Sequence, residues 1–172
     1  MAKAKIKGLD EAIEEIFKDY KKVIKDAAQE ATEKAKDDLY ANAVSCLVAY
    51  YDDYDPTSYN RTYSLIKSFV PYAKDVQEDV DGFLCVAGVE FDPSKLEDVY
   101  YGSAKYSPAD PEWILDNFLQ GKHGEVHSKY TISNGSFIPA DEMQNYVNNY
   151  YNTFDYYFRR SISKQILRTI RR

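Results

Sequence analysis

A chain of 172 residues suits one compact domain, since domains of roughly 100 to 200 residues can bury a core of their own. Its 22 lysine and arginine residues against 28 aspartate and glutamate residues leave a net charge of -6, which argues against a general nucleic-acid binder held by phosphate neutralisation. No apolar run approaches the roughly 20 residues that span a bilayer, and the charged start lacks the apolar segment of a signal peptide. We therefore expect a single domain, residues 1–172, that is made in the cytoplasm and has no membrane partner.

Residues 9–52 are predicted to form one long amphipathic helix. Gly8 precedes this segment, and Asp10 and Glu11 stand where the positive end of a helix dipole favours acids. The first half carries dense charge around a narrow apolar stripe, a pattern typical of a helix that is packed on one side only or against a neighbouring subunit. Asp55-Pro56 ends the helix, because a residue before proline is pushed out of the α region. The apolar positions recur mostly at three- and four-residue intervals, namely Ile13, Ile16, Tyr20, Val23, Ala27, Ala31, Ala35, Leu39, Cys46 and Tyr50.

Residues 63–91 are predicted to supply the strands of a small antiparallel sheet. The stretches 63–70 and 83–91 are rich in aromatic and β-branched residues, and Asp81-Gly82 between them is a hairpin-type turn sequence. We expect two to four strands. The following stretch, 92–110, contains two prolines, a glycine and paired tyrosines, which favours an ordered loop.

Two further helices complete the predicted fold. Asp110-Pro111 is typical of an N-cap followed by a first-turn proline, and it opens a short helix over residues 111–121 that ends at Gly121. The last helix, residues 139–170, has apolar positions at helical spacing and a basic end. The fold class is therefore α+β, with a long N-terminal helix and a C-terminal helix packed on a small antiparallel β-sheet.

Charge and tyrosine content indicate contact surfaces. Residues 155–172 carry a charge of +5, whereas the other 154 residues carry -11, and opposite charges of this kind favour ordered contact between copies. Seventeen tyrosines accompany one tryptophan, and tyrosine offers a large contact area with a polar tip. The interface residues that we predict are Tyr54, Tyr59, Arg61, Tyr63, Tyr100, Tyr101, Arg159, Arg160, Lys164, Arg168, Arg171 and Arg172.

The basic residues of the last helix admit two interpretations. Arginines can contact passing phosphates without sequence preference. They can equally compensate the helix dipole and form salt bridges with the acidic first helix of a neighbour, and we favour this second interpretation.

Candidate catalytic and metal-binding residues are sparse. His123 and His127 have the four-residue spacing of helical zinc ligands, but Gly121 and Gly124 bracket His123 and the chain has no third histidine. Cys46 and Cys85 lie in apolar sequence without paired-ligand spacing, so we expect reduced core cysteines. Neither a phosphate-cradling glycine loop nor a GxSxG motif is present. We predict no catalytic residue, no metal and no cofactor.

Four segments of the sequence, taken in order, resemble segments of a known protein family. They are the opening Lys5-Ile6-Lys7-Gly8-Leu9-Asp10-Glu11, the element Arg61-Thr62-Tyr63-Ser64-Leu65, the segment Val99-Tyr100-Tyr101-Gly102 and the segment Trp113-Ile114-Leu115-Asp116-Asn117-Phe118-Leu119-Gln120-Gly121-Lys122-His123-Gly124. With the charged first helix and the closing helix, this order resembles the neck or tail-completion proteins of tailed bacteriophages, also described as minor tail components. In that family an element similar to Arg-Thr-Gly-x-Leu usually precedes the first strand, so Tyr63 stands at the glycine position.

The resemblance implies a non-enzymatic structural protein of the virion, assembled in the host bacterial cytoplasm. Its copies are expected to form a ring of six or twelve at the head-tail junction, with other neck, portal-side and tail ring proteins as partners and DNA passing through a channel non-specifically. The loop Asp52 to Tyr63 and the tyrosines near Tyr100 would meet the rings above or below. Two alternatives stay open: a small cytoplasmic protein-binding module that acts through a tyrosine-rich surface, and an enzyme that uses the region of His123 and His127.

Overall fold

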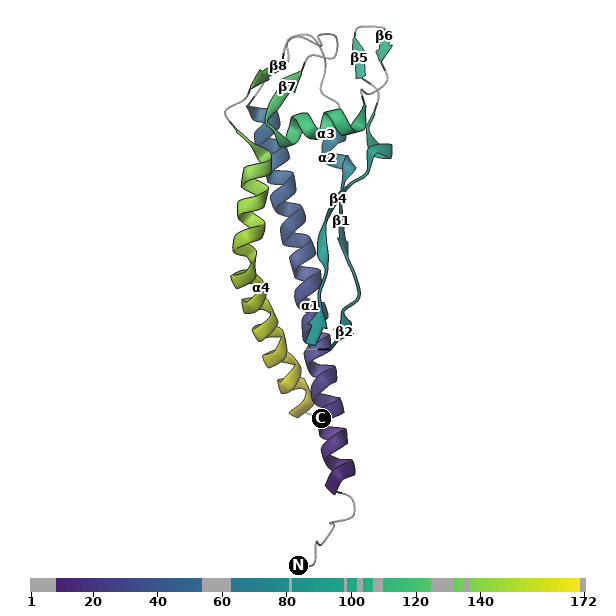
Figure 1. The fold of residues 1–172 in the computed structure, drawn as a ribbon, viewed down its shortest axis with the longest axis vertical. Coiled ribbons are helices and arrows are strands. Elements are labelled where there is room, and N and C mark those ends of the chain that lie inside the picture. The colour runs from purple at the N-terminus through teal and green to yellow at the C-terminus, as the bar shows by residue number, and fades with distance from the viewer. Residues whose placement is uncertain are drawn as a thin grey trace, which may run out of the picture.

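The computed structural model describes residues 9–53, 63–80, 82–97, 99–101, 104–106, 110–124, 132–134 and 137–170. Helix α1 (Leu9–Asp52) has 44 residues and so spans about 66 Å at 1.5 Å per residue. Helix α4 (Pro139–Ile170) runs back along one side of α1, and a long two-stranded arm lies along another side (Figure 1). The molecule is elongated, with a broad end near Asp52 and a narrow end near Leu9 (Figure 1).

The arm consists of strands β1 to β4. β1 (Phe69–Ala73) pairs antiparallel with β4 (Ala87–Phe91), and β2 (Gln77–Asp79) pairs antiparallel with β3 (Gly82–Leu84) at the tip. Between the two ladders, the Lys74 amide donates to the Val86 carbonyl at 2.9 Å, so the pairing continues along the arm. Because two strands alone are marginally stable in water, the arm depends on α1 for support.

Small elements gather at the broad end (Figure 1). They begin with helix α2 just before β1, and α3 crosses over the end of α1 (Figure 1). Two further antiparallel pairs, β5 with β6 and β7 with β8, complete this end. Their bounds are α2 Ser64–Ser68, the 3-10 helix η1 Pro93–Lys95, β5 Val99–Tyr101, β6 Ala104–Tyr106, α3 Pro111–Leu119, β7 Lys122–Gly124 and β8 Ile132–Asn134.

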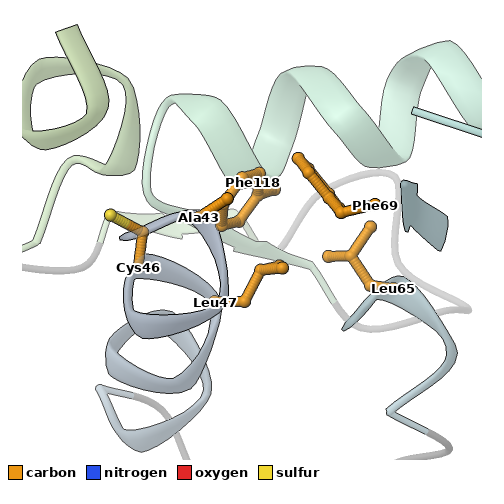
Figure 2. Close-up of a cluster of buried hydrophobic side chains, with 6 residues drawn as sticks. All are labelled: Ala43, Cys46, Leu47, Leu65, Phe69 and Phe118. Atoms are coloured by element: carbon orange, nitrogen blue, oxygen red, sulfur yellow. The ribbon is translucent and has the colours of Figure 1, made fainter. Parts of the chain in front are cut away.

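The hydrophobic core also lies at the broad end. Phe118 of α3 is fully buried, and its ring packs edge-on against Phe69 at 5.5 Å and against Tyr50 at 5.3 Å. Figure 2 shows the side chains of α1, α2, β1 and α3 converging on this point. The cluster therefore joins three distant parts of the sequence, namely α1, the adjoining α2 and β1, and α3. Its buried members are Ala43, Cys46, Leu47, Leu65, Phe69 and Phe118.

Alanines rather than large side chains fill the middle of α1. Ala27, Ala28, Ala31 and Ala35 are all buried, and small side chains allow neighbouring elements to approach a helix backbone closely. On the arm side, the Val76 amide donates to Oε1 of Gln29 at 2.8 Å, which satisfies a backbone group where the strand pairing is interrupted. The middle of α1 is thus covered by α4 and by the arm.

The predicted fold class is confirmed: the long N-terminal helix, the C-terminal helix and a small antiparallel sheet are all present, as expected for α+β. The predicted ranges 9–52 and 139–170 coincide with α1 and α4. The predicted helix 111–121 is α3, which ends at Leu119 and is followed by Gly121 in the left-handed region with φ of 64°. Asp110 is its N-cap, and its carboxylate accepts from the Glu112 amide at 3.1 Å.

Two local predictions were wrong, and a third was slightly displaced. The stretch 63–70 was expected to be extended, but Ser64–Ser68 forms α2, in which Ser68 Oγ donates to the Ser64 carbonyl and Leu65 enters the core. The predicted hairpin is present as β2 and β3, but its turn begins at Val80: Gly82 pairs with Asp79 as a strand residue, and Asp81 lies outside the described residues. The expected loop 92–110 contains η1, β5 and β6. Burial of Leu65 in the tertiary structure outweighs the local strand preference around α2.

Candidate interaction surfaces

The interface between α1 and α4 is held by polar contacts. The Tyr150 hydroxyl donates to Oδ2 of Asp38 at 2.8 Å, and Lys34 pairs with the same Asp38. Lys34 Nζ also lies 5.5 Å from the ring centre of Tyr157, a cation-π distance. Burial, followed by the hydrogen bond to Asp38, raises the pKa of Tyr150 above its ordinary value, so its hydroxyl stays a donor. These contacts fix α4 against the middle of α1.

The first part of α1 packs against much less. Figure 1 shows α1 continuing past the end of α4 and past the tip of the arm. On this part, Ile13, Ile16, Phe17 and Tyr20 are 42%, 67%, 68% and 57% exposed. Their spacing of three, one and three residues places them on one helix face, which we call the α1 stripe. A large apolar stripe that no described residue covers is typical of a contact surface.

The basic end of α4 forms a second surface. Arg160, Ser163, Lys164, Leu167 and Arg168 line an open groove of about 400 Å³, which we call the basic groove. Lys164 pairs with Glu30 of α1, whereas Arg160 and Arg168 make no ion pair with another residue in the part of the chain that the structure describes. Leu167 is 55% exposed, so the groove combines free positive charge with apolar area.

The predicted interface residues fall into two separate groups. Tyr63 precedes α2, and Tyr100 and Tyr101 lie in β5, all at the broad end (Figure 1). Arg159, Arg160, Lys164 and Arg168 lie on the last turns of α4, toward the narrow end (Figure 1). Arg159 pairs with Asp155 at 2.7 Å, which accounts for its charge within α4. The remaining predictions, Tyr54, Tyr59, Arg61, Arg171 and Arg172, lie outside the described residues.

Tyr63 has an unusual backbone. Its φ of 55° makes it the one non-glycine residue in the left-handed region among the residues that the structure describes. This conformation costs about 1–2 kcal/mol for a residue with a Cβ. The Tyr63 ring packs edge-on against Tyr51 at 5.0 Å, and that contact offsets part of the cost.

The α1 stripe was anticipated only in part. The sequence pattern placed Ile13, Ile16 and Tyr20 on a narrow apolar face that a neighbouring subunit could cover, but Phe17 and these positions were not among the predicted interface residues. The signal was present in the sequence as the spacing of residues 13, 16, 17 and 20. Helix α4 holds further exposed apolar and aromatic residues that were not predicted as interface residues, namely Val147, Tyr151 and Tyr156.

The described residues offer little chemistry. No three histidine, cysteine, aspartate or glutamate side chains gather into a metal-binding group within the described ranges. His123 lies in β7, and His127 lies outside the described residues. Cys46 and Cys85 are both free thiols, and burial next to the Glu142 carboxylate raises the pKa of the Cys46 thiol, which makes it a poor nucleophile.

Fold and surfaces together define an elongated α+β protein that exposes an apolar helix stripe and a basic groove toward its narrow end. No protein-family model, curated protein or solved structure matches the chain. Among the described helices, none has the length and apolar content needed to cross a membrane.

Proposed function

We propose that this chain is a structural virion protein of a tailed bacteriophage, a neck or tail-completion protein that forms a ring at the head-tail junction. The observation that carries the proposal is the separation of contact surfaces along an elongated body. The α1 stripe and the basic groove lie toward the narrow end, and the tyrosines of β5 and Tyr63 lie at the broad end. A ring subunit needs such a division, because it contacts its copies through some surfaces and adjacent rings through others.

The backbone of Tyr63 supports the family resemblance on which this proposal draws. The resembled element carries glycine at the position of Tyr63, and Tyr63 adopts a positive φ of 55°, the conformation that glycine favours. Leu65, the leucine of the same element, is buried in the core. The element thus has the turn geometry that a glycine would supply, followed by an anchoring side chain.

In the proposed ring of six or twelve copies, the broad end faces neighbouring neck, portal-side or tail rings through Tyr63, Tyr100 and Tyr101. Arg160 and Arg168 contact acidic surfaces of the adjacent subunit, and any contact with DNA is non-specific. The work of the protein is mechanical and electrostatic, without a catalytic step or a cofactor.

Particle size tests the proposal. Purified protein is examined by sedimentation velocity and negative-stain electron microscopy, alone and with its neighbouring ring proteins. We expect rings of six or twelve copies, and antibody labelling of the virion at the neck. Strictly monomeric protein under both conditions, together with its absence from purified virions, would contradict the proposal.

A second candidate is a small cytoplasmic protein-binding module. Tyr151 and Tyr156 of α4 are 77% and 58% exposed, so such a module could use these tyrosines as contact residues. Gene neighbours separate the two candidates, since portal, terminase and tail genes beside this one favour the virion protein.

A further inference from the structure

The α1 stripe continues the face of α1 that α4 covers. Going along α1 from Tyr20, the same face passes through Val23 and Ile24, which are half-buried, to Ala27 and Ala31, which are buried. Figure 1 shows that α4 ends before α1 does. The stripe is therefore the part of a helix-helix interface for which the described chain supplies no partner.

Charge argues against pairing of two α1 stripes with each other. Residues 9–20 contain five acids and one lysine, which is a net charge of -4 around the stripe. Two identical stripes brought together would bring these charges together as well, and juxtaposed like charges cost affinity and exclude that partner. The occupant of the stripe must instead be apolar in its centre and basic at its margins.

The basic groove has that character. Residues 159–172 contain six basic residues and no acid. In the groove, Leu167 supplies apolar area, and the alkyl stems and guanidinium groups of Arg160 and Arg168 can pack over an aromatic ring such as that of Phe17.

We propose that the α1 stripe of one copy packs in the basic groove of the next copy, with the acids around the stripe facing Arg160 and Arg168. This inference rests on the ring proposed above and assigns its subunit contact. The contact is heterologous, because it joins two different surfaces. Each copy therefore keeps one stripe and one groove to offer, and a chain of such contacts closes into a ring when the rotation per subunit permits.

Two complementary variants test the pairing. The double change Ile16→Asp and Phe17→Asp removes the stripe and leaves the groove intact, whereas Arg160→Glu and Arg168→Glu reverse the groove and leave the stripe intact. Each variant alone is expected to associate at least about 30-fold more weakly than the wild type, the loss typical of interface hot spots. An equimolar mixture of the two is expected to give a 1:1 dimer that grows no further, since only one intact stripe and one intact groove meet.

The matched control is Val147→Asp, which places a charge on an apolar α4 residue that is 53% exposed but lies outside the groove. It should assemble like the wild type. All changed side chains are on the surface, so circular dichroism and thermal unfolding of the dilute variants should match those of the wild type.

A second measurement uses an otherwise unchanged chain. A photo-crosslinking benzoylphenylalanine replaces Phe17, and the crosslinked peptides are identified by mass spectrometry. Crosslinks to the peptide that contains Leu167 of another copy are expected, whereas crosslinks between two copies of residues 9–20 would overturn the proposal. Rings that persist unchanged in the Ile16→Asp, Phe17→Asp variant would overturn this contact and leave the ring itself standing. A wild-type protein that stays monomeric, alone and with ring partners, would remove both.

Discussion

The two halves of α1 carry similar side chains in opposite environments. Toward the broad end, Leu47 is fully buried and Cys46 is 2% exposed, because α2, α3 and the arm close around them. Toward the narrow end, Ile16 and Phe17 of the same helix are 67% and 68% exposed. The comparison teaches that apolar side chains on one continuous helix meet two fates. Those at the broad end build the core, and those at the narrow end stay exposed, where the proposed subunit contact would use them. Once the buried half nucleates the helix, extension to the exposed half costs little.

The largest effect is expected from Phe118→Ala in the core. Phe118 is fully buried between Phe69 and Tyr50, so truncation should lower the free energy of unfolding by about 3–5 kcal/mol in urea titrations. Phe17→Ala is the matched control at the exposed end. Under dilute conditions it should change stability by less than about 0.5 kcal/mol. Equal losses of unfolding free energy in Phe118→Ala and Phe17→Ala would contradict the difference between the buried and exposed halves of α1.

A second pair of variants examines the middle of α1. Ala31 is 1% exposed where α1 is covered, so Ala31→Leu overpacks the site and should destabilise the protein by about 1–3 kcal/mol. Ala41 is exposed on the same helix, and Ala41→Leu should leave the midpoint of thermal unfolding almost unchanged. If Ala31→Leu is tolerated equally well, α4 and the arm do not approach α1 closely.

Tyr150→Phe measures how much one polar contact between α1 and α4 contributes to the stability of the covered part of α1. The change removes the hydroxyl that donates to Asp38 and should cost about 1–2 kcal/mol at neutral pH. Because the pKa of Tyr150 is raised in the folded protein, unfolding releases its proton once the pH exceeds about 10, the ordinary tyrosine value. The stability advantage of the wild type over Tyr150→Phe is therefore present below pH 10 and shrinks above it, as measured by urea unfolding at each pH. Tyr151→Phe, at an exposed neighbour, should show neither effect.

The smallest expected effect concerns Tyr63. With φ of 55°, this position favours glycine over alanine, so Tyr63→Gly should be more stable than Tyr63→Ala by about 1 kcal/mol. At Ala41, an ordinary exposed helix position, the order reverses, and Ala41→Gly should lose about 1 kcal/mol. The midpoints of thermal unfolding of Tyr63→Gly, Tyr63→Ala and Ala41→Gly test both expected differences in stability. An alanine variant at position 63 as stable as the glycine variant would argue against the left-handed backbone.

Some predictions that rested on local signals agreed with the structure. Helical periodicity gave α1 and α4, and the Asp110-Pro111 pair marked the start of α3 because an N-cap is a contact within a few residues. The helix Ser64–Ser68 was missed, since it depends on burial of Leu65 against distant elements. The same contrast between local signals and distant contacts applies to the basic groove and the α1 stripe. Composition pointed to Arg160 and Arg168, but periodicity marks an apolar face without saying whether α4 reaches far enough to cover Phe17.

The unbroken length of α1 has a mechanical consequence. A helix of 44 residues is stiff over its whole span, so it connects the two ends of the molecule as a lever. From Leu47 in the core to Leu9 the helix rises about 57 Å, so a rotation of about 5° at the core displaces the opposite tip by about 5 Å. A small adjustment at the broad end would thus become a movement of nearly one helical turn at the other end, and in the proposed ring this would relay strain from one subunit contact to the next.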